Sequence, residues 1–105
     1  MKGMGNMGHL MKQVKKLQEE MEKKQAEINE MRLDASSGGG MVTATVNGRG
    51  KLQALKIEAE VIDPEDPEML VDLILAAVQQ AQRDAEEKSE ELLGPLAQGM
   101  PGVMP

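Results

Sequence analysis

Apolar residues recur with a heptad period through the first third of the chain. The positions of this seam are Met7, Leu10, Val14, Leu17, Met21, Lys24, Ile28 and Met31, of which only Lys24 is polar. A narrow apolar stripe of this kind is typical of a helix that packs against another helix. The pattern predicts a helix about 37 Å long at ~1.5 Å per residue. Its predicted dimer or helix-packing seam consists of Leu10, Val14, Leu17, Met21, Ile28 and Met31.

The middle of the chain alternates between apolar and polar residues, as half-buried strands do. In the clearest run, Val42, Ala44 and Val46 point to one face of a strand. A weaker alternation over residues 32–36 predicts a strand before this one, and residues 51–59 predict a strand after it. A third strand is needed because an isolated hairpin is only marginally stable in water. The pattern therefore predicts a small antiparallel sheet.

Glycines mark the two turns of this sheet. Three glycines at residues 38–40 precede the central strand, and Asn47-Gly48 follows it. We expect Asn47-Gly48 to supply the positive φ angles of a tight hairpin. In the third strand Leu52 is out of phase with the core-facing Leu55, which predicts a β-bulge.

A second helical pattern begins after residue 62. The Asp-Pro pairs at residues 63–64 and 66–67 each offer an acidic N-cap with proline at the first helical position. The alanines within residues 76–85 indicate close approach to the sheet or to a partner helix. We expect Gly94-Pro95 to end this helix. The predicted fold class is therefore α+β, in the order α-β-β-β-α.

Composition separates the ends of the chain from its centre. We expect one domain over residues 8–93, preceded by a flexible arm at residues 1–7 and followed by a disordered Gly/Pro/Met tail at residues 94–105. The chain has no Phe, Tyr or Trp, so its core must consist of smaller apolar side chains. Because a small domain buries a modest fraction of its surface alone, we expect a homodimer.

Charge is distributed unevenly along a chain whose formal net charge is −6. The first 18 residues carry four lysines and no acid, whereas residues 61–105 carry ten acids and two bases. Cationic side chains at the basic end are candidates for contact with DNA phosphates. The candidate DNA-binding residues are Lys12, Lys15, Lys16, Lys23, Arg49 and Lys51. Proteins usually hold single-stranded bases by stacking them on aromatic side chains. Because this chain has no aromatic side chain, duplex DNA is the favoured target.

Other kinds of chemistry find little support in the sequence. Gly3, Gly5 and Gly8 fit a G-x-G-x-x-G pattern, but no strand can precede them as a dinucleotide site requires. Three methionines near the N-terminus are spaced like soft-metal ligands, but a flexible, mildly apolar arm with Met as an adaptable packing residue is the favoured explanation. With no Cys and one His, a pair of nucleophile and base is nearly unavailable. We expect no catalytic residues, cofactor, metal or small-molecule substrate.

No apolar run approaches the ~20 residues that cross a bilayer. We therefore expect no membrane partner and a cytoplasmic location.

Several of these stretches together resemble a known family. They are Gly8-His9-Leu10-Met11-Lys12-Gln13, Gly38-Gly39-Gly40-Met41-Val42, Asn47-Gly48, Ile57 with Ile62-Asp63-Pro64, and Glu68-Met69-Leu70-Val71-Asp72-Leu73-Ile74 with Ala76-Ala77. In this order and spacing they resemble the YbaB/EbfC family of bacterial nucleoid-associated proteins. The resemblance covers residues 6–92.

This resemblance implies a tweezer-like homodimer in which two long helices flank the small sheet of each subunit. It also implies that the dimer binds double-stranded DNA with little sequence specificity and influences nucleoid organisation and gene expression. The alternative is a coiled-coil protein-interaction or chaperone-like module that grips another protein through the Met-rich seam and does not bind DNA.

Overall fold

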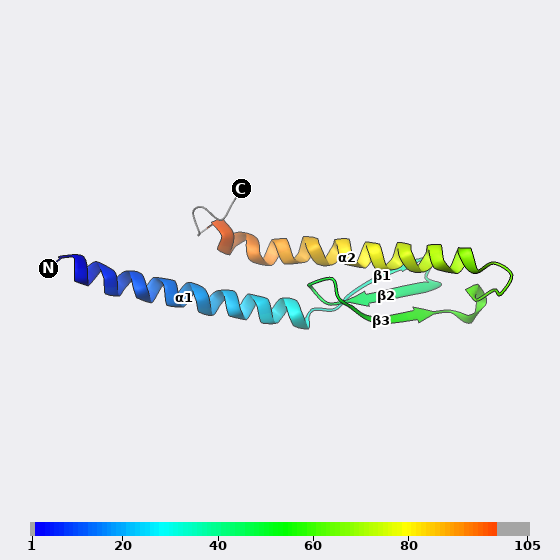
Figure 1. Ribbon diagram of the computed structural model, residues 1–105, viewed down its shortest axis with the longest axis horizontal. Coiled ribbons are helices and arrows are strands. Elements are labelled where there is room, and N and C mark those ends of the chain that lie inside the picture. The colour runs from blue at the N-terminus through cyan, green and yellow to red at the C-terminus, as the bar shows by residue number, and fades with distance from the viewer. Residues whose placement is uncertain (1, 99–105) are drawn as a thin grey trace.

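Two long helices and a three-stranded sheet make up the protein (Figure 1). The computed structural model describes the backbone of residues 2–98 and the side chains of residues 7–96. The elements are α1 (Lys2–Glu30), β1 (Leu33–Ser37), β2 (Val42–Val46), β3 (Leu52–Ile57), a 3-10 helix (Ala59–Val61) and α2 (Pro67–Gln98). The expected α-β-β-β-α order is confirmed. The expected tail lies outside the described residues from residue 99 onwards, as does Met1.

The sheet is antiparallel, with β2 between β1 and β3. Val46 pairs with Leu52, whereas the preceding Thr45 pairs with Ala54, so Gln53 is an extra residue in β3. This shift is the β-bulge that the phase of Leu52 predicts. It places Leu52 on the same face of the sheet as Val46.

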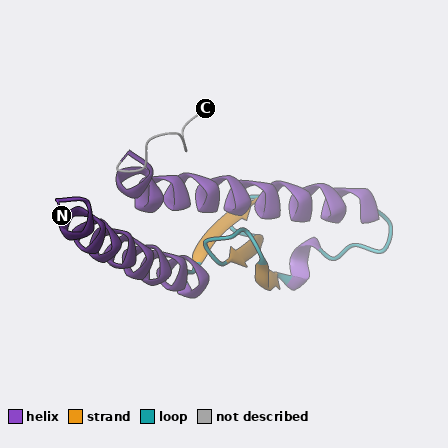
Figure 2. Cartoon of the chain, turned by 60° about the vertical axis from the view of Figure 1, so that its left-hand side comes forward, coloured by secondary structure: helices purple, strands orange, loops and turns teal. Residues whose placement is uncertain are grey.

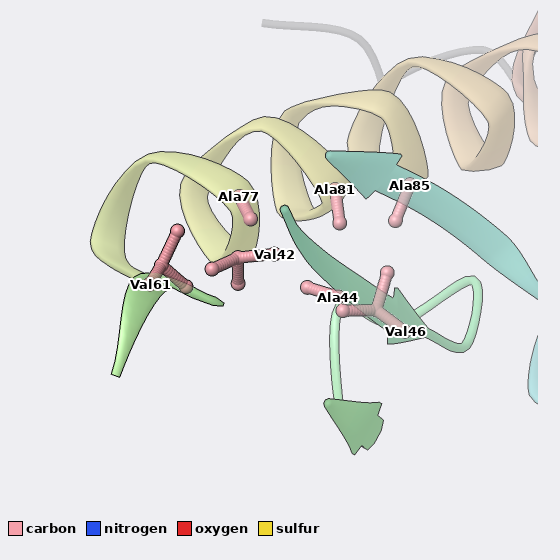
Figure 3. Packing of buried hydrophobic residues seen from close by; sticks show 7 residues of the cluster. All are labelled: Val42, Ala44, Val46, Val61, Ala77, Ala81 and Ala85. Carbon is pink, nitrogen blue, oxygen red and sulfur yellow. The ribbon is translucent and has the colours of Figure 1, made fainter. Parts of the chain in front are cut away.

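The core forms where α2 lies along one face of the sheet (Figure 2). Val42, Ala44 and Val46 of β2 are fully buried, which confirms the predicted alternation. Three alanines of α2 point at them, as Figure 3 shows; they are Ala77, Ala81 and Ala85, and each is 0% exposed. Side chains this small let the helix backbone come close to the strands. The expected close approach is therefore made to the sheet.

The second Asp-Pro pair begins α2. Asp66 caps the helix, since its Oδ1 accepts a hydrogen bond from the backbone N–H of Met69 at 3.3 Å. Pro67 then occupies the first helical position. Asp63 shapes the preceding turn instead, where its Oδ1 accepts the N–H of Glu65 at 2.9 Å.

The expected end of α2 at Gly94-Pro95 is wrong. The helix continues through Pro95 to Gln98. Proline removes one backbone N–H and so deprives the carbonyl four residues earlier of its helical partner, but its fixed φ angle is compatible with a helix. This loss falls within the last turns of α2, where carbonyl groups can bond to water.

The expected conformation of the β2–β3 turn is also wrong. Asn47 and Gly48 do not have positive φ angles. In this turn the residue with a positive φ angle is Gly50, at 82°. The turn is a longer one that is held by the side chain of Asn47. Its Oδ1 accepts the backbone N–H groups of Arg49 at 2.9 Å and of Lys51 at 3.0 Å.

Nearly the whole of α1 and the C-terminal part of α2 extend past the same end of the sheet (Figure 1). The protein is consequently elongated, with dimensions of 79 × 25 × 17 Å. The seam of α1 is covered unevenly: Ile28, beside the sheet, is 2% exposed, whereas Leu10 is 57% and Val14 46% exposed. We call residues 7–23 of α1, which lead away from this covered base, the α1 arm.

Candidate nucleic-acid interface

Four of the six candidate DNA-binding residues lie on the α1 arm. Lys12, Lys15, Lys16 and Lys23 are all exposed. At about 100° per residue, Lys12, Lys16 and Lys23 fall within about 40° of one another around the helix axis, in a line about 16 Å long. We call these three residues the basic stripe. It lies on the side of α1 opposite the apolar seam, which includes Met21 and Ile28.

The ammonium groups of these four lysines are available for a ligand. In the described part of the chain the ion pairs are Lys24–Glu27 at 3.8 Å, Lys56–Glu58 at 3.7 Å and Lys88–Glu91 at 3.5 Å. Glu19 lies beside the stripe, between Lys16 and Lys23. Residues 7–18 carry no acid, so positive charge is most concentrated from Lys12 to Lys16, and the nearest acids are Glu19 and Glu20 one turn farther along α1.

Arg49 lies at the base of the arm, and its side chain is already engaged. Its Nη2 donates to Oε1 of Gln25 at 2.6 Å, and its Nε donates to Oδ1 of Asn29. Both acceptors are on α1. The structure thus places Arg49 between the hairpin and the helix, apart from Lys12, Lys15 and Lys16.

Lys51 lies on the other side of the hairpin tip, just before β3, and is exposed. An open groove of about 860 Å³ is lined by Gly48, Arg49 and Gly50 of the hairpin tip and by residues of α2. Glu86 and Glu90 are the charged residues that α2 contributes to its lining. Two carboxylates repel phosphate, so this groove is a poor entry for DNA.

No group of three or more His, Cys, Asp or Glu side chains in the described part of the chain is placed to hold a metal ion. None of the helices described here is both long and apolar enough to cross a membrane. The acidic residues before α2 instead cap the helix and its preceding turn. The remaining candidate site on the described surface is the group of exposed lysines on the α1 arm.

A comparison with known families decides what kind of protein this is. The YbaB/EbfC DNA-binding family matches residues 4–100. The chain belongs to this family.

Relatives support this assignment along nearly the whole chain. A nucleoid-associated protein of Alkaliphilus metalliredigens is 48% identical over 105 residues, which cover 98% of this chain and 92% of the relative. One from Clostridium perfringens is 50% identical over 103 residues, which cover 96% of this chain and 92% of that relative. One from Streptomyces griseus is 46% identical over 100 residues, which cover 95% of this chain and 88% of that relative.

A solved structure shares the fold. An uncharacterized protein from Helicobacter pylori superimposes with a TM-score of 0.73 over 83% of this chain and 91% of its own, at 24% sequence identity. The family match and the nucleoid-associated relatives confirm the family resemblance stated from the sequence. The description of YbaB/EbfC as a DNA-binding family agrees with the expectation that this chain is not an enzyme.

Sequence reasoning missed the residues that join the YbaB/EbfC hairpin to its helices. Gln25 and Asn29 accept the Arg49 guanidinium, and Ser89 of α2 donates its hydroxyl to the Gly48 carbonyl at 2.5 Å. These are polar residues on helix surfaces that look like ordinary solvated positions. Their partners are 20 to 41 residues away along the chain, so no local pattern identifies them.

Proposed function

We propose that this protein binds double-stranded DNA as a homodimer with little sequence specificity. It acts in the nucleoid of the bacterial cytoplasm, where it influences nucleoid organisation and gene expression. The observation that carries this proposal is the set of four exposed lysines on the α1 arm, which form no ion pair with any described residue, in a chain that belongs to a DNA-binding family. The relatives named nucleoid-associated proteins support the location.

The proposed contacts are with phosphates. Lys12, Lys15, Lys16 and Lys23 present ammonium groups along α1, and Lys51 adds one at the hairpin. Contacts with the phosphate backbone position a protein without reading sequence. The described surface also has no aromatic side chain to stack on unpaired bases, because the chain contains none. Both features favour a sequence-tolerant interaction with the duplex.

A salt titration tests this proposal. If four to six phosphates are contacted per dimer, the logarithm of the binding constant should fall with the logarithm of salt concentration with a slope of about −4 to −5. Fluorescence anisotropy with labelled duplexes of unrelated sequence measures the slope, and a single strand of the same length is the control. We expect similar affinities for the duplexes and weaker binding of the single strand. A slope near zero, or a preference for the single strand, would contradict the proposal.

The homodimer would form through an apolar surface that one chain leaves open. α2 packs on β1 and β2, so the β3 part of the same sheet face is uncovered, with Leu52 45% and Leu55 38% exposed. On α2, Val71 is 52% and Leu75 50% exposed. A two-fold axis through this surface would bury it on both copies.

The position of Gln82 shows that these α2 residues flank β3. The amide of Gln82 donates to the carbonyl of Gly50, just before β3, at 3.1 Å. Val71, Leu75 and Gln82 are spaced by four and seven residues, so they lie on one side of the helix. The exposed leucines of β3 and this side of α2 therefore border the same apolar surface, which is the proposed dimer interface.

Leu55→Glu is expected to weaken the dimer at least tenfold. Two-fold symmetry introduces the substitution twice, and each carboxylate would be buried without a partner. Sedimentation equilibrium at low micromolar concentration measures the association. Ala54→Glu, on the opposite face of the same strand, is the matched control and should remain dimeric. A monomeric unsubstituted protein would refute the homodimer, and a dimeric Leu55→Glu variant would refute the interface.

Exposed apolar residues on the α1 arm support the second candidate function, a protein-binding module. Met7 is 63% and Met11 67% exposed. This alternative predicts protein binding that survives replacement of the lysines but is lost in Met21→Asp. Family membership favours the DNA-binding proposal.

A further inference from the structure

The tip of the β2–β3 hairpin holds the base of α1. The N–H of Gly48 donates to the carbonyl of Ile28 at 2.9 Å. The next residue, Arg49, donates to Gln25 and to Asn29 from two nitrogens of one guanidinium. Three hydrogen bonds thus connect the tip to the last two turns of α1.

The same tip is fastened to α2. Ser89 donates to the carbonyl of Gly48 at 2.5 Å, and Gln82 donates to that of Gly50 at 3.1 Å. The tip therefore sits between the two long helices and contacts both. Because α2 is packed on the sheet through buried alanines, the tip has a firm support on that side.

Farther out, residues 7–16 of the α1 arm are all exposed. Its exposed seam residues, which include Leu10 and Val14, contact little of the described chain. Lys12 is about 20 Å along the helix from Gln25. A tilt of about 15° at the base would move Lys12 by about 5 Å, which exceeds the reach of an ion pair. Small changes at the base thus decide where the lysines are.

We propose that the hairpin tip is a clamp that sets the direction in which α1 leaves the sheet, and that Arg49 is its positioning residue. The clamp consists of Gly48 and Arg49 on the hairpin with Gln25, Ile28 and Asn29 on α1. This inference rests on the proposed DNA-binding function, which uses the lysines that the clamp positions. It assigns Arg49 a role different from the phosphate contact expected from its charge.

The chemistry of the contact suits a clamp. The planar guanidinium offers donors in a fixed fork, so two acceptors on successive turns of α1 define its orientation. Both acceptors are neutral amides, so the contact depends on geometry more than on charge. A lysine would keep the charge at position 49 and lose the fork.

A distance measurement without DNA tests the clamp directly. The chain has no cysteine, so Gln18→Cys on α1 and Ala76→Cys on α2 can carry the only two spin labels. Labelled chains are mixed with excess unlabelled protein, so that distances within one copy dominate. We expect one narrow distance distribution that Arg49→Ala broadens by several ångströms. Lys56→Ala, which removes an exposed charge elsewhere on the sheet, should leave it narrow.

DNA binding separates a positioning role from a phosphate contact. If the free arm adopts the competent direction about a fifth of the time, Arg49→Ala weakens duplex binding about fivefold. Arg49→Lys and the uncharged double variant Gln25→Ala with Asn29→Ala should show the same loss. None of the three should change the salt slope, since no phosphate contact is removed. Circular dichroism confirms that each variant remains folded.

Two results would overturn the clamp. One is an unchanged distance distribution in Arg49→Ala. The other is a salt slope that becomes shallower in Arg49→Ala, by about 0.9 for each phosphate that the arginine had neutralised, combined with normal binding by the Gln25 and Asn29 double variant. If the unsubstituted protein does not bind duplex DNA, the proposed function fails, while the distance measurement still decides the clamp.

Discussion

Replacing Lys12, Lys15 and Lys16 together by glutamate is expected to abolish the retention of duplex DNA in a low-salt gel shift. The three lysines are exposed and form no ion pair in the described part of the chain, and the nearest acids on α1, Glu19 and Glu20, lie one turn beyond Lys15 and Lys16. A dimer carries six of these ammonium groups, and if four of them contact phosphates, removing those contacts corresponds to about a 1,000-fold loss of affinity at 0.1 M salt. Glutamates at these positions would in addition repel the phosphates.

A variant with the same change in net charge distinguishes a local site from general repulsion. Lys56, Arg83 and Lys88 lie on β3 and α2, outside the proposed interface. Replacing them by glutamate also lowers the net charge of −6 by six units per chain. At 0.1 M salt, where the Debye length is about 10 Å, this control should lose much less affinity. Equal losses in the two triple variants would refute the assignment of the site to the arm.

Gly48→Ala is expected to lower the free energy of unfolding by about 2–3 kcal/mol. A Cβ atom at Gly48 would lie 2.5 Å from the carbonyl oxygen of Ile28 and 2.8 Å from its Cγ2. A backbone oxygen cannot rotate away, so the hairpin and α1 would have to separate. The hydrogen bond from Gly48 to Ile28 at 2.9 Å would break as they separate.

Urea denaturation followed by circular dichroism measures this loss. Gly94→Ala is the matched control, because a Cβ atom there meets nothing within 4 Å. Gly94 lies within α2, where alanine has the better helix propensity by up to about 1 kcal/mol. We therefore expect Gly48→Ala to lower the free energy of unfolding and Gly94→Ala to raise it. Equal stability of Gly48→Ala and the unsubstituted protein would show that the close approach is not maintained.

Much of the fold could be predicted because its determinants are local. Alternation identified the buried side of β2, and the phase of Leu52 identified the bulge, both of which the structure confirms. The alanines of α2 indicated close packing for the same reason, since side-chain size is visible in the sequence. Local sequence motifs were less decisive at two places.

Those two places are the β2–β3 turn and the end of α2. The pair Asn47-Gly48 matches a two-residue hairpin, yet Gly48 is required for its approach to Ile28 and the positive φ angle falls at Gly50. Gly94-Pro95 matches a helix end, yet α2 continues to Gln98. In each case the sequence motif is compatible with more than one backbone conformation.

The sequence by itself determined the helices and strands, the apolar faces and the excess of lysine near the N-terminus, since each depends on the order of neighbouring residues. Only the tertiary structure decided that Arg49 bonds to α1, that α2 leaves the β3 leucines exposed and that the α1 arm is held at one end. These properties depend on contacts between residues 20 or more positions apart. Such contacts follow from how the elements pack, which no local pattern records.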